Sequence, residues 1–398
     1  MKIKIHIFSI ETYFILIVVY YFIISTTYLT RQFFDLNLIR PSLFFLLLIN
    51  IFFIAGNIKY GLKVNAFFLF LLISFSLSSI YGLINNGLSL RSLTDILKPL
   101  NFLFIYIIVS KLPFPNKKVI QKVSNRLLYI TIIFSVLTII LYLLIGGRVG
   151  VILPFAVPLS FAIYNVNILN IVFIVLATFF SGNRASFFVA FFVIFWLFLW
   201  NHKKYLFYIL FPILFIFIFF NNQILSSSFY KRNIEYTINQ SITAIHNKNY
   251  LTLDKISSGR ISEIVTIFSE FKAADYIFGK GIGFNYQAKK IINNNFDLIP
   301  TNKEQSNSHF SPLGLYLSYG ILFVFIFYFF IFYYLRIGYL NMKNNFIVYI
   351  SFYIILFTFL ESFFSFQIFN NPFLPIALGW IENYKRNYKV FKDMIKTL

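Results

Sequence analysis

Residues 64–84 read VNAFFLFLLISFSLSSIYGLI, and this stretch decides what kind of protein the chain forms. It carries no charged residue, and it has the ~20 residues that an α-helix needs to cross a hydrocarbon layer about 30 Å thick. The stretch therefore predicts a helix that spans a membrane.

Similar apolar runs recur along most of the 398 residues. They predict about 12 spans, of which the sixth, seventh and twelfth are short, over the approximate ranges 7–29, 37–56, 64–84, 96–112, 124–145, 150–164, 167–181, 185–200, 205–220, 308–335, 346–367 and 371–383. The predicted fold class is an all-α, polytopic transmembrane protein. It divides into an N-terminal transmembrane region (1–220), a large, partly helical loop (221–306), and a C-terminal transmembrane region with a basic tail (307–398).

The composition excludes several other classes of protein. Hydrophobic residues make up 59% of the chain and charged residues 12%, with a mean hydropathy of +0.78. Soluble domains carry roughly 25% charged residues, so neither a soluble globule nor a disordered or fibrous chain fits. With no cysteine, a disulfide framework and a thiolate metal site or nucleophile are excluded. The four scattered histidines lack zinc-site spacing and the acidic residues lack a DxD-like pair, so we expect no metal and no cofactor.

The chain has 34 Lys and Arg against 13 Asp and Glu, a net charge of +21. With both ends in the cytoplasm, 18 of these basic residues fall in cytoplasmic segments. The short outside loops hold six: Arg31, Arg40, Arg91, Lys98, Arg148 and Arg184. Because positive charge favours the cytoplasmic side, this division predicts that the large loop lies outside. That loop balances 10 basic residues with 7 acidic ones, so its charge gives no reason to expect nucleic acid as a partner.

Part of the large loop has the pattern of an amphipathic helix. Apolar residues follow helical spacing over 261–271, at Ile261, Ile264, Val265, Phe268 and Phe271. Ser257 and Ser258 are candidate N-caps, and the helix is expected to end near Asp275. The glycine run 279–283 then predicts a tight turn. The loop is expected to be a folded lid on the outer membrane face.

Three basic side chains meet at the outer face in this topology. Arg184 lies in a tight turn between two spans, Arg260 begins the loop helix, and His309 lies where the chain re-enters the membrane. Two guanidinium groups suit a diphosphate, and a histidine accepts a proton near neutral pH. Each of the three, taken alone, is better explained as an interfacial anchor or a loop-capping side chain.

Glu361 is predicted to lie within the eleventh span, toward its outer end. An ionisable residue at that depth usually faces a cavity or a partner. One hypothesis pairs Glu361 with an arginine or gives it a role toward the acceptor substrate. The alternative is a buried structural hydrogen bond.

Three stretches together resemble the O-antigen ligase and polymerase superfamily of bacterial membrane glycosyltransferases (GT-C type). They are ATFFSGNRAS at 177–186, SSGRISEIVTIFSEFKAADYIFGKGIG at 257–283 and SHFSPLGLYLSYGILF at 308–323. Their order matches the family's Ser-Arg turn, loop helix with glycine turn, and histidine-containing re-entry. The resemblance covers about 177–335, and residues 310–311, Phe-Ser, depart from the Asn that follows the histidine in many relatives.

The resemblance implies an enzyme of the bacterial inner membrane that acts at the periplasmic face on undecaprenyl-diphosphate-linked glycans. By this carry-over, Arg184 and Arg260 bind the diphosphate, and His309 orients or deprotonates the acceptor hydroxyl. A direct displacement without a metal would invert the anomeric centre. Partners would be the glycan donor and acceptor, membrane lipids and a chain-length regulator.

Three functions remain open on this basis. The first is a Wzy-type O-antigen or surface-polysaccharide polymerase that joins repeat units. The second is an O-antigen ligase, which would transfer the glycan to the lipid A core. The third is a flippase for lipid-linked oligosaccharides, for which the long outer loop would have no evident use.

Overall fold

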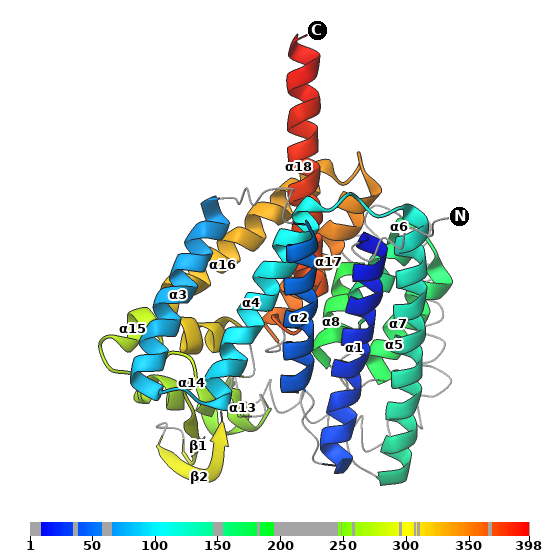
Figure 1. Cartoon of the computed structure of the whole chain (residues 1–398). Helices are drawn as coiled ribbons and strands as arrows, with labels where there is room; N and C mark the ends of the chain where they lie inside the picture. The colour runs from blue at the N-terminus through cyan, green and yellow to red at the C-terminus, as the bar shows by residue number, and fades with distance from the viewer. Residues whose placement is uncertain are drawn as a thin grey trace.

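The computed structural model describes residues 9–34, 39–57, 66–145, 154–180, 184–194, 246–247, 249–256, 259–293, 297–305, 308, 311–364 and 368–397. Within these residues the chain is almost entirely helical (Figure 1). The helices and strands are α1 (Ile10–Phe34), α2 (Ile39–Asn57), α3 (Ala66–Asn86), α4 (Leu90–Lys111), α5 (Lys117–Ile145), α6 (Ala156–Tyr164), α7 (Ile168–Phe180), α8 (Arg184–Val193), α13 (Tyr250–Ile256), α14 (Arg260–Ser269), α15 (Asp275–Phe278), β1 (Tyr286–Ile291), β2 (Leu298–Gln305), α16 (Ser311–Asn341), α17 (Phe346–Ser362) and α18 (Phe373–Thr397).

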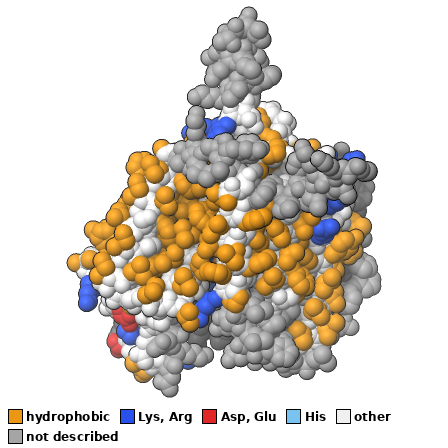
Figure 2. Space-filling model, in the orientation of Figure 1, with side chains coloured by type: hydrophobic (Ala, Val, Ile, Leu, Met, Phe, Trp, Pro, Cys, Tyr) orange, Lys and Arg blue, Asp and Glu red, His pale blue; other side chains and the backbone are white. Residues whose placement is uncertain are grey.

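Five of the described helices are long and apolar enough to cross a membrane: α2, α3, α4, α5 and α16. Shorter apolar helices lie within α1, α7 and α17. Large apolar side chains cover the outside of these helices, as the space-filling view shows (Figure 2). On α3, for example, Ile73, Leu77, Ile80 and Ile84 are 47–78% exposed. Water-soluble monomers rarely expose such large apolar surfaces, so the prediction of an all-α protein embedded in a membrane is confirmed.

Buried polar side chains link helices inside the bundle. The hydroxyl of Tyr13 on α1 donates to Asn50 Oδ1 on α2 at 2.7 Å, and Asn50 Nδ2 donates to Asn101 Oδ1 on α4 at 3.0 Å. Asn101 Nδ2 in turn donates to the carbonyl of Leu43 at 2.9 Å. Inside a membrane the hydrophobic effect does not drive helices together, because lipid tails are as apolar as the side chains. Hydrogen bonds between the helices therefore help to fix their packing.

The loop elements and the C-terminal helix leave the bundle at opposite ends (Figure 1). Helices α13 to α15 and the hairpin β1–β2 gather at the end where α3 finishes and α4 and α16 begin. Helix α18 runs to the other end and extends beyond it. We call the first end of the bundle the loop side.

Several predicted boundaries are wrong. Five of the six basic residues assigned to short outside loops lie within helices, namely Arg31 in α1, Arg40 in α2, Arg91 and Lys98 in α4, and Arg184 in α8, while Arg148 lies outside the described residues. Helix α4 starts at Leu90, before its apolar run, because the side chain of Ser89 accepts from the Ser92 N–H in a capping box. The first two turns of α4 are therefore polar and helical.

The loop helix differs from its prediction in three respects. Its N-cap is Gly259, and not Ser257 or Ser258. It is present as α14, but it ends at Ser269, and Asp275 instead begins the separate short helix α15. The buried residues of α14 are Ser262, Glu263, Thr266 and Ile267, whereas the predicted apolar position Phe268 is 37% exposed. The antiparallel hairpin β1–β2 that follows was not predicted, since its first strand, YQAKKI, is polar.

Candidate functional site

Arg184 is the first residue of α8. The side chain of Arg184 and the turn 181–183 before it lie outside the part of the chain that the structure describes. Two residues further on, Ser186 is buried and faces α17. The position of Ser186 therefore fixes where the first turn of α8, and with it the backbone of Arg184, meets the rest of the bundle.

Glu361 lies in the last turn of α17, and its carboxylate is buried against α8. Ser186 Oγ donates a hydrogen bond to Glu361 Oε1 at 2.5 Å. This hydrogen bond gives one oxygen of the buried carboxyl group a partner and offsets part of the cost of burying it. This contact favours the structural alternative for Glu361, in which the carboxylate holds α8 to α17.

Arg260 is the first residue of α14 and reaches the same end of α17. Its Nη2 donates to the carbonyl oxygen of Phe364 at 2.9 Å, three residues beyond Glu361. The start of α14 is fixed in turn by Asp254, whose Oδ1 accepts from the Ser262 N–H at 2.7 Å. Gly259, at φ 84°, adopts the left-handed conformation that lets the chain turn into the helix.

His309 lies outside the described residues, as do residues 306–307 and 310. Its neighbours Ser308 and Ser311 are both buried, and Ser311 begins α16 on the loop side. Of the four predicted site residues, the structure thus brings three together at one place. The start of α8 with Arg184, the start of α14 with Arg260, and the end of α17 with Glu361 meet there, and we call this junction the arginine end.

The arginine end has the elements of an anion site. Helix starts carry a partial positive charge, and here two of them, at α8 and α14, each begin with an arginine. The guanidinium of Arg260 uses one of its N–H groups for Phe364, and a guanidinium has five N–H donors in all. Placed on the loop side of an apolar bundle, such a junction can bind an oxyanion at the membrane surface.

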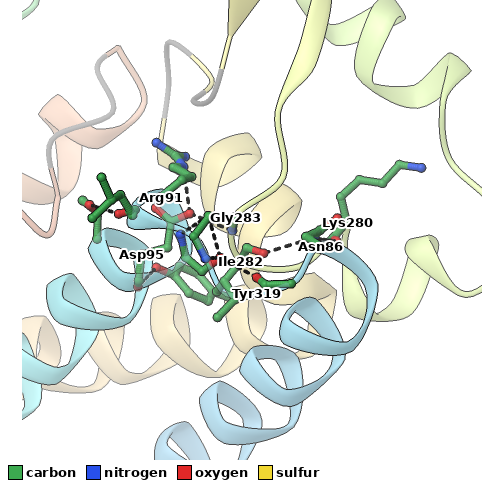
Figure 3. A network of polar contacts seen from close by, with 12 residues as sticks. Asn86, Arg91, Asp95, Lys280, Ile282, Gly283 and Tyr319 are labelled. Atoms are coloured by element: carbon green, nitrogen blue, oxygen red, sulfur yellow. Dashed lines mark hydrogen bonds and ion pairs between the residues drawn. The ribbon is translucent and has the colours of Figure 1, made fainter.

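A second polar cluster lies beside α4, where we had predicted only a connecting loop (Figure 3). Arg91 Nε pairs with Asp95 Oδ2 at 2.9 Å, and the same oxygen accepts from the Gly283 N–H at 3.1 Å. The hydroxyl of Tyr319 on α16 donates to the carbonyl of Asp95 at 2.6 Å. The i, i+4 spacing of Arg91 and Asp95 was visible in the sequence, but its partners on the loop were not.

The glycine run of the loop packs against this cluster. Asn86 Nδ2 donates to the carbonyls of Lys280 and Ile282, both at 3.0 Å, and the N–H groups of residues 280 and 281 donate to the Leu317 carbonyl. Gly279, Gly281 and Gly283 all have φ between 71° and 85°, so the predicted tight turn is confirmed. We call this contact of residues 279–283 with α3, α4 and α16 the glycine seam.

The glycine seam and α14 are joined through the hairpin. The hydroxyl of Tyr286 on β1 donates to Glu263 Oε1 on α14 at 2.6 Å, and Lys289 Nζ lies 3.3 Å from Glu270 Oε1. Burial and the carboxylate of Glu263 raise the pKa of Tyr286, so it is a neutral donor. The helix that carries Arg260 is therefore attached both to α17 and, through Tyr286, to the glycine seam.

No protein-family model matches this chain, and neither a curated protein nor a solved structure matches it. The class of protein therefore rests on the fold itself. It is an all-α protein embedded in a membrane, with a structured loop at one end of its helices.

Proposed function

We propose that this protein is a surface-polysaccharide polymerase of the O-antigen type, which joins undecaprenyl-diphosphate-linked repeat units at the periplasmic face of a bacterial inner membrane. The observation that supports it best is the arginine end. Two helices that begin with arginine meet the end of a third helix on the loop side of an apolar bundle. A lipid diphosphate presents its charge at that boundary between lipid and water.

In the proposed reaction, a hydroxyl of the incoming unit attacks the anomeric carbon of the growing chain. The bond from that carbon to the diphosphate oxygen breaks, and the lipid diphosphate leaves with the bonding electrons. Arg184 and Arg260 would stabilise the charge that develops on the diphosphate. His309 would orient the attacking hydroxyl and accept its proton. A single displacement inverts the anomeric configuration and needs no metal.

The proposal includes the full topology of about 12 spans with both ends in the cytoplasm. Because the chain has no cysteine, a single cysteine at Asn247 can be labelled without interference. Labelling by a membrane-impermeant reagent from the periplasmic side supports this topology. Labelling only after the inner membrane is opened contradicts it.

A deletion strain separates the three candidate functions. Loss of a polymerase leaves lipopolysaccharide with one capped repeat unit, whereas loss of an O-antigen ligase leaves bare core. Loss of a flippase leaves lipid-linked units on the cytoplasmic side. We expect the first result, restored to a full ladder by the wild-type chain and not by R184A, R260A or H309A at equal protein levels.

A further inference from the structure

Helix α15 and the residues beside it have the reverse of the polarity expected for a loop in water. Its apolar side chains point outward, with Tyr276 51%, Ile277 55% and Phe278 37% exposed. The one charged side chain of α15, that of Asp275, points inward. Asp275 is buried, and its Oδ2 lies 2.8 Å from Lys280 Nζ, whose side chain is only 13% exposed. Segments that bury ion pairs and expose apolar groups are typical of contact with lipid.

The position of α15 along the bundle agrees with this. The ring of Phe278 stacks on Tyr81 of α3 with centroids 5.2 Å apart, and Asp275 Oδ1 accepts from the Tyr81 hydroxyl at 3.0 Å. Tyr81 lies five residues before the end of α3 at Asn86, which is about 7 Å of helix. Helix α15 therefore lies beside the last turns of a membrane-spanning helix and not beyond its end (Figure 1).

The exposed face of α15 also continues an apolar surface already assigned to lipid. Ile80 and Ile84 of α3, 56% and 78% exposed, belong to the apolar row on α3 at the same level as Tyr81. Tyr276 joins an aromatic cluster with Phe268, Phe271 and Tyr316. Tyrosine and phenylalanine at this level resemble the aromatic belt of a membrane interface.

Non-helical backbone can lie at membrane depth only where protein satisfies its polar groups. Around α15 the protein does so. Asp275 Oδ2 accepts from the Lys272 N–H at 2.7 Å, Lys280 Nζ donates to the Glu270 carbonyl, and the glycine seam supplies the hydrogen bonds of residues 280–283.

We infer that residues 276–278 are seated in the lipid leaflet on the loop side, with the acyl chains and their ester region as the partner that covers them. The loop is then anchored in the membrane surface through α15 and does not stand above it in water. This inference rests on the apolar bundle and the contacts of α15, and it holds whatever reaction the protein catalyses.

Site-directed spin labelling tests this directly, because the full chain is naturally free of cysteine. Single labels are placed at I277C, at I80C as the lipid-facing reference, and at I292C, 48% exposed in the hairpin, as the aqueous reference. The protein is reconstituted in phospholipid vesicles, and each label's collision rates with oxygen and with a water-soluble nickel chelate are compared. Y276C provides a second reporter if I277C is poorly incorporated.

We expect the oxygen-to-nickel accessibility ratio at residue 277 to match that at residue 80 and to exceed that at residue 292 several-fold. A ratio equal to that at residue 292 would place α15 in water and overturn the inference. Protection of residue 277 from both reagents would also overturn it, since that result means that a second copy or another protein covers the face.

Discussion

The glycine seam and the arginine end lie on the same side of the bundle and hold the same loop, but by different means. At the seam, backbone meets backbone: a Cβ on Gly82 would lie 2.3 Å from the Ile282 nitrogen, and one on Gly281 would lie 2.3 Å from the Gly82 Cα. At the arginine end, side chains make the described contacts: Ser186 donates to Glu361, and Arg260 donates to the Phe364 carbonyl.

This difference separates two tasks. Backbone contacts at van der Waals limits leave few alternative arrangements, so the seam fixes where the loop is attached. Side-chain hydrogen bonds leave the backbone in place when they are exchanged for bonds to a ligand, such as an oxyanion that replaces the Phe364 carbonyl as the partner of Arg260. The arginine end is therefore suited to release its contacts when an anion binds, while the seam stays in place.

The largest expected effect is on the seam. G281A adds a methyl group at φ 85° against the Gly82 Cα, so we expect a loss of about 2–5 kcal/mol, from left-handed strain of about 1–2 kcal/mol and overpacking of about 1–3 kcal/mol. G87A is the matched control, since Gly87 has φ 72° with open space around its Cβ position, and it should lose only the strain. Thermal unfolding in detergent compares the two, and equal losses would show that the seam is not close-packed.

At the arginine end we expect R260A to reduce activity about 10²–10³-fold, as does the loss of one donor that stabilises a developing oxyanion. The protein should remain folded, since Arg260 donates to an exposed carbonyl at a helix end. R336A, which alters an exposed arginine near the far end of α16, is the control and should retain activity. Polymer ladders in a deletion strain report the difference, and a full ladder from R260A would remove Arg260 from the site.

Substitutions at Ser186 and at Glu361 should differ in how much stability they cost. S186A takes a hydrogen-bond donor from a buried carboxylate and should destabilise the protein by about 1–3 kcal/mol. E361Q keeps an oxygen that accepts from Ser186, so it should cost less stability and leave polymer formation close to wild type. A fall in turnover of about 10²–10⁴-fold in folded E361Q would contradict this and indicate proton transfer by Glu361.

The smallest expected effect is a change in how the unfolding temperature depends on pH. Burial alone raises the pKa of Asp275, but hydrogen bonds from Lys272, Lys280 and Tyr81 outweigh it and lower the pKa below its ordinary value of 3.8. A depressed pKa in the folded state adds stability that is present above the unfolded value and is lost as pH falls through the folded value. Unfolding temperatures in detergent should therefore drop less steeply below about pH 4 for D275N than for wild type. Parallel curves would exclude this contribution.

The fold could be predicted as far as hydrophobicity determines it. The run at 64–84 corresponds to α3, Ala66–Asn86, because a helix in lipid has to match the thickness of the apolar layer. Helix starts such as Leu90 were missed because a capping box, and not the apolar run, sets them. The burial of Ser262 and Glu263 on α14 was missed because periodicity assumes a polar exterior, whereas these two residues hydrogen-bond to Asp254 and Tyr286 of the loop.

The site shows the same limit. Arg184, Arg260 and Glu361 could be proposed from the sequence because the predicted topology places them toward the outer face, and the two arginines fall in the stretches that carry the family resemblance. Their hydrogen-bond partners could not be predicted. The contacts of Glu361 with Ser186 and of Arg260 with Phe364 depend on how α8, α14 and α17 pack, and the paired residues lie more than 100 positions apart in the sequence. The contact of Asp95 with Gly283 spans 188 residues and left no sign in either segment alone.

The central claim is that the arginine end acts on a lipid diphosphate on the loop side of the membrane. Its most direct test uses the purified chain in vesicles with one defined undecaprenyl-diphosphate-linked repeat unit and follows the products by gel and by mass. We predict a ladder of polymers with inverted linkage from wild type, and none from the R184A/R260A double variant. A folded wild-type protein that makes no polymer, or a double variant that makes as much as wild type, would contradict the account.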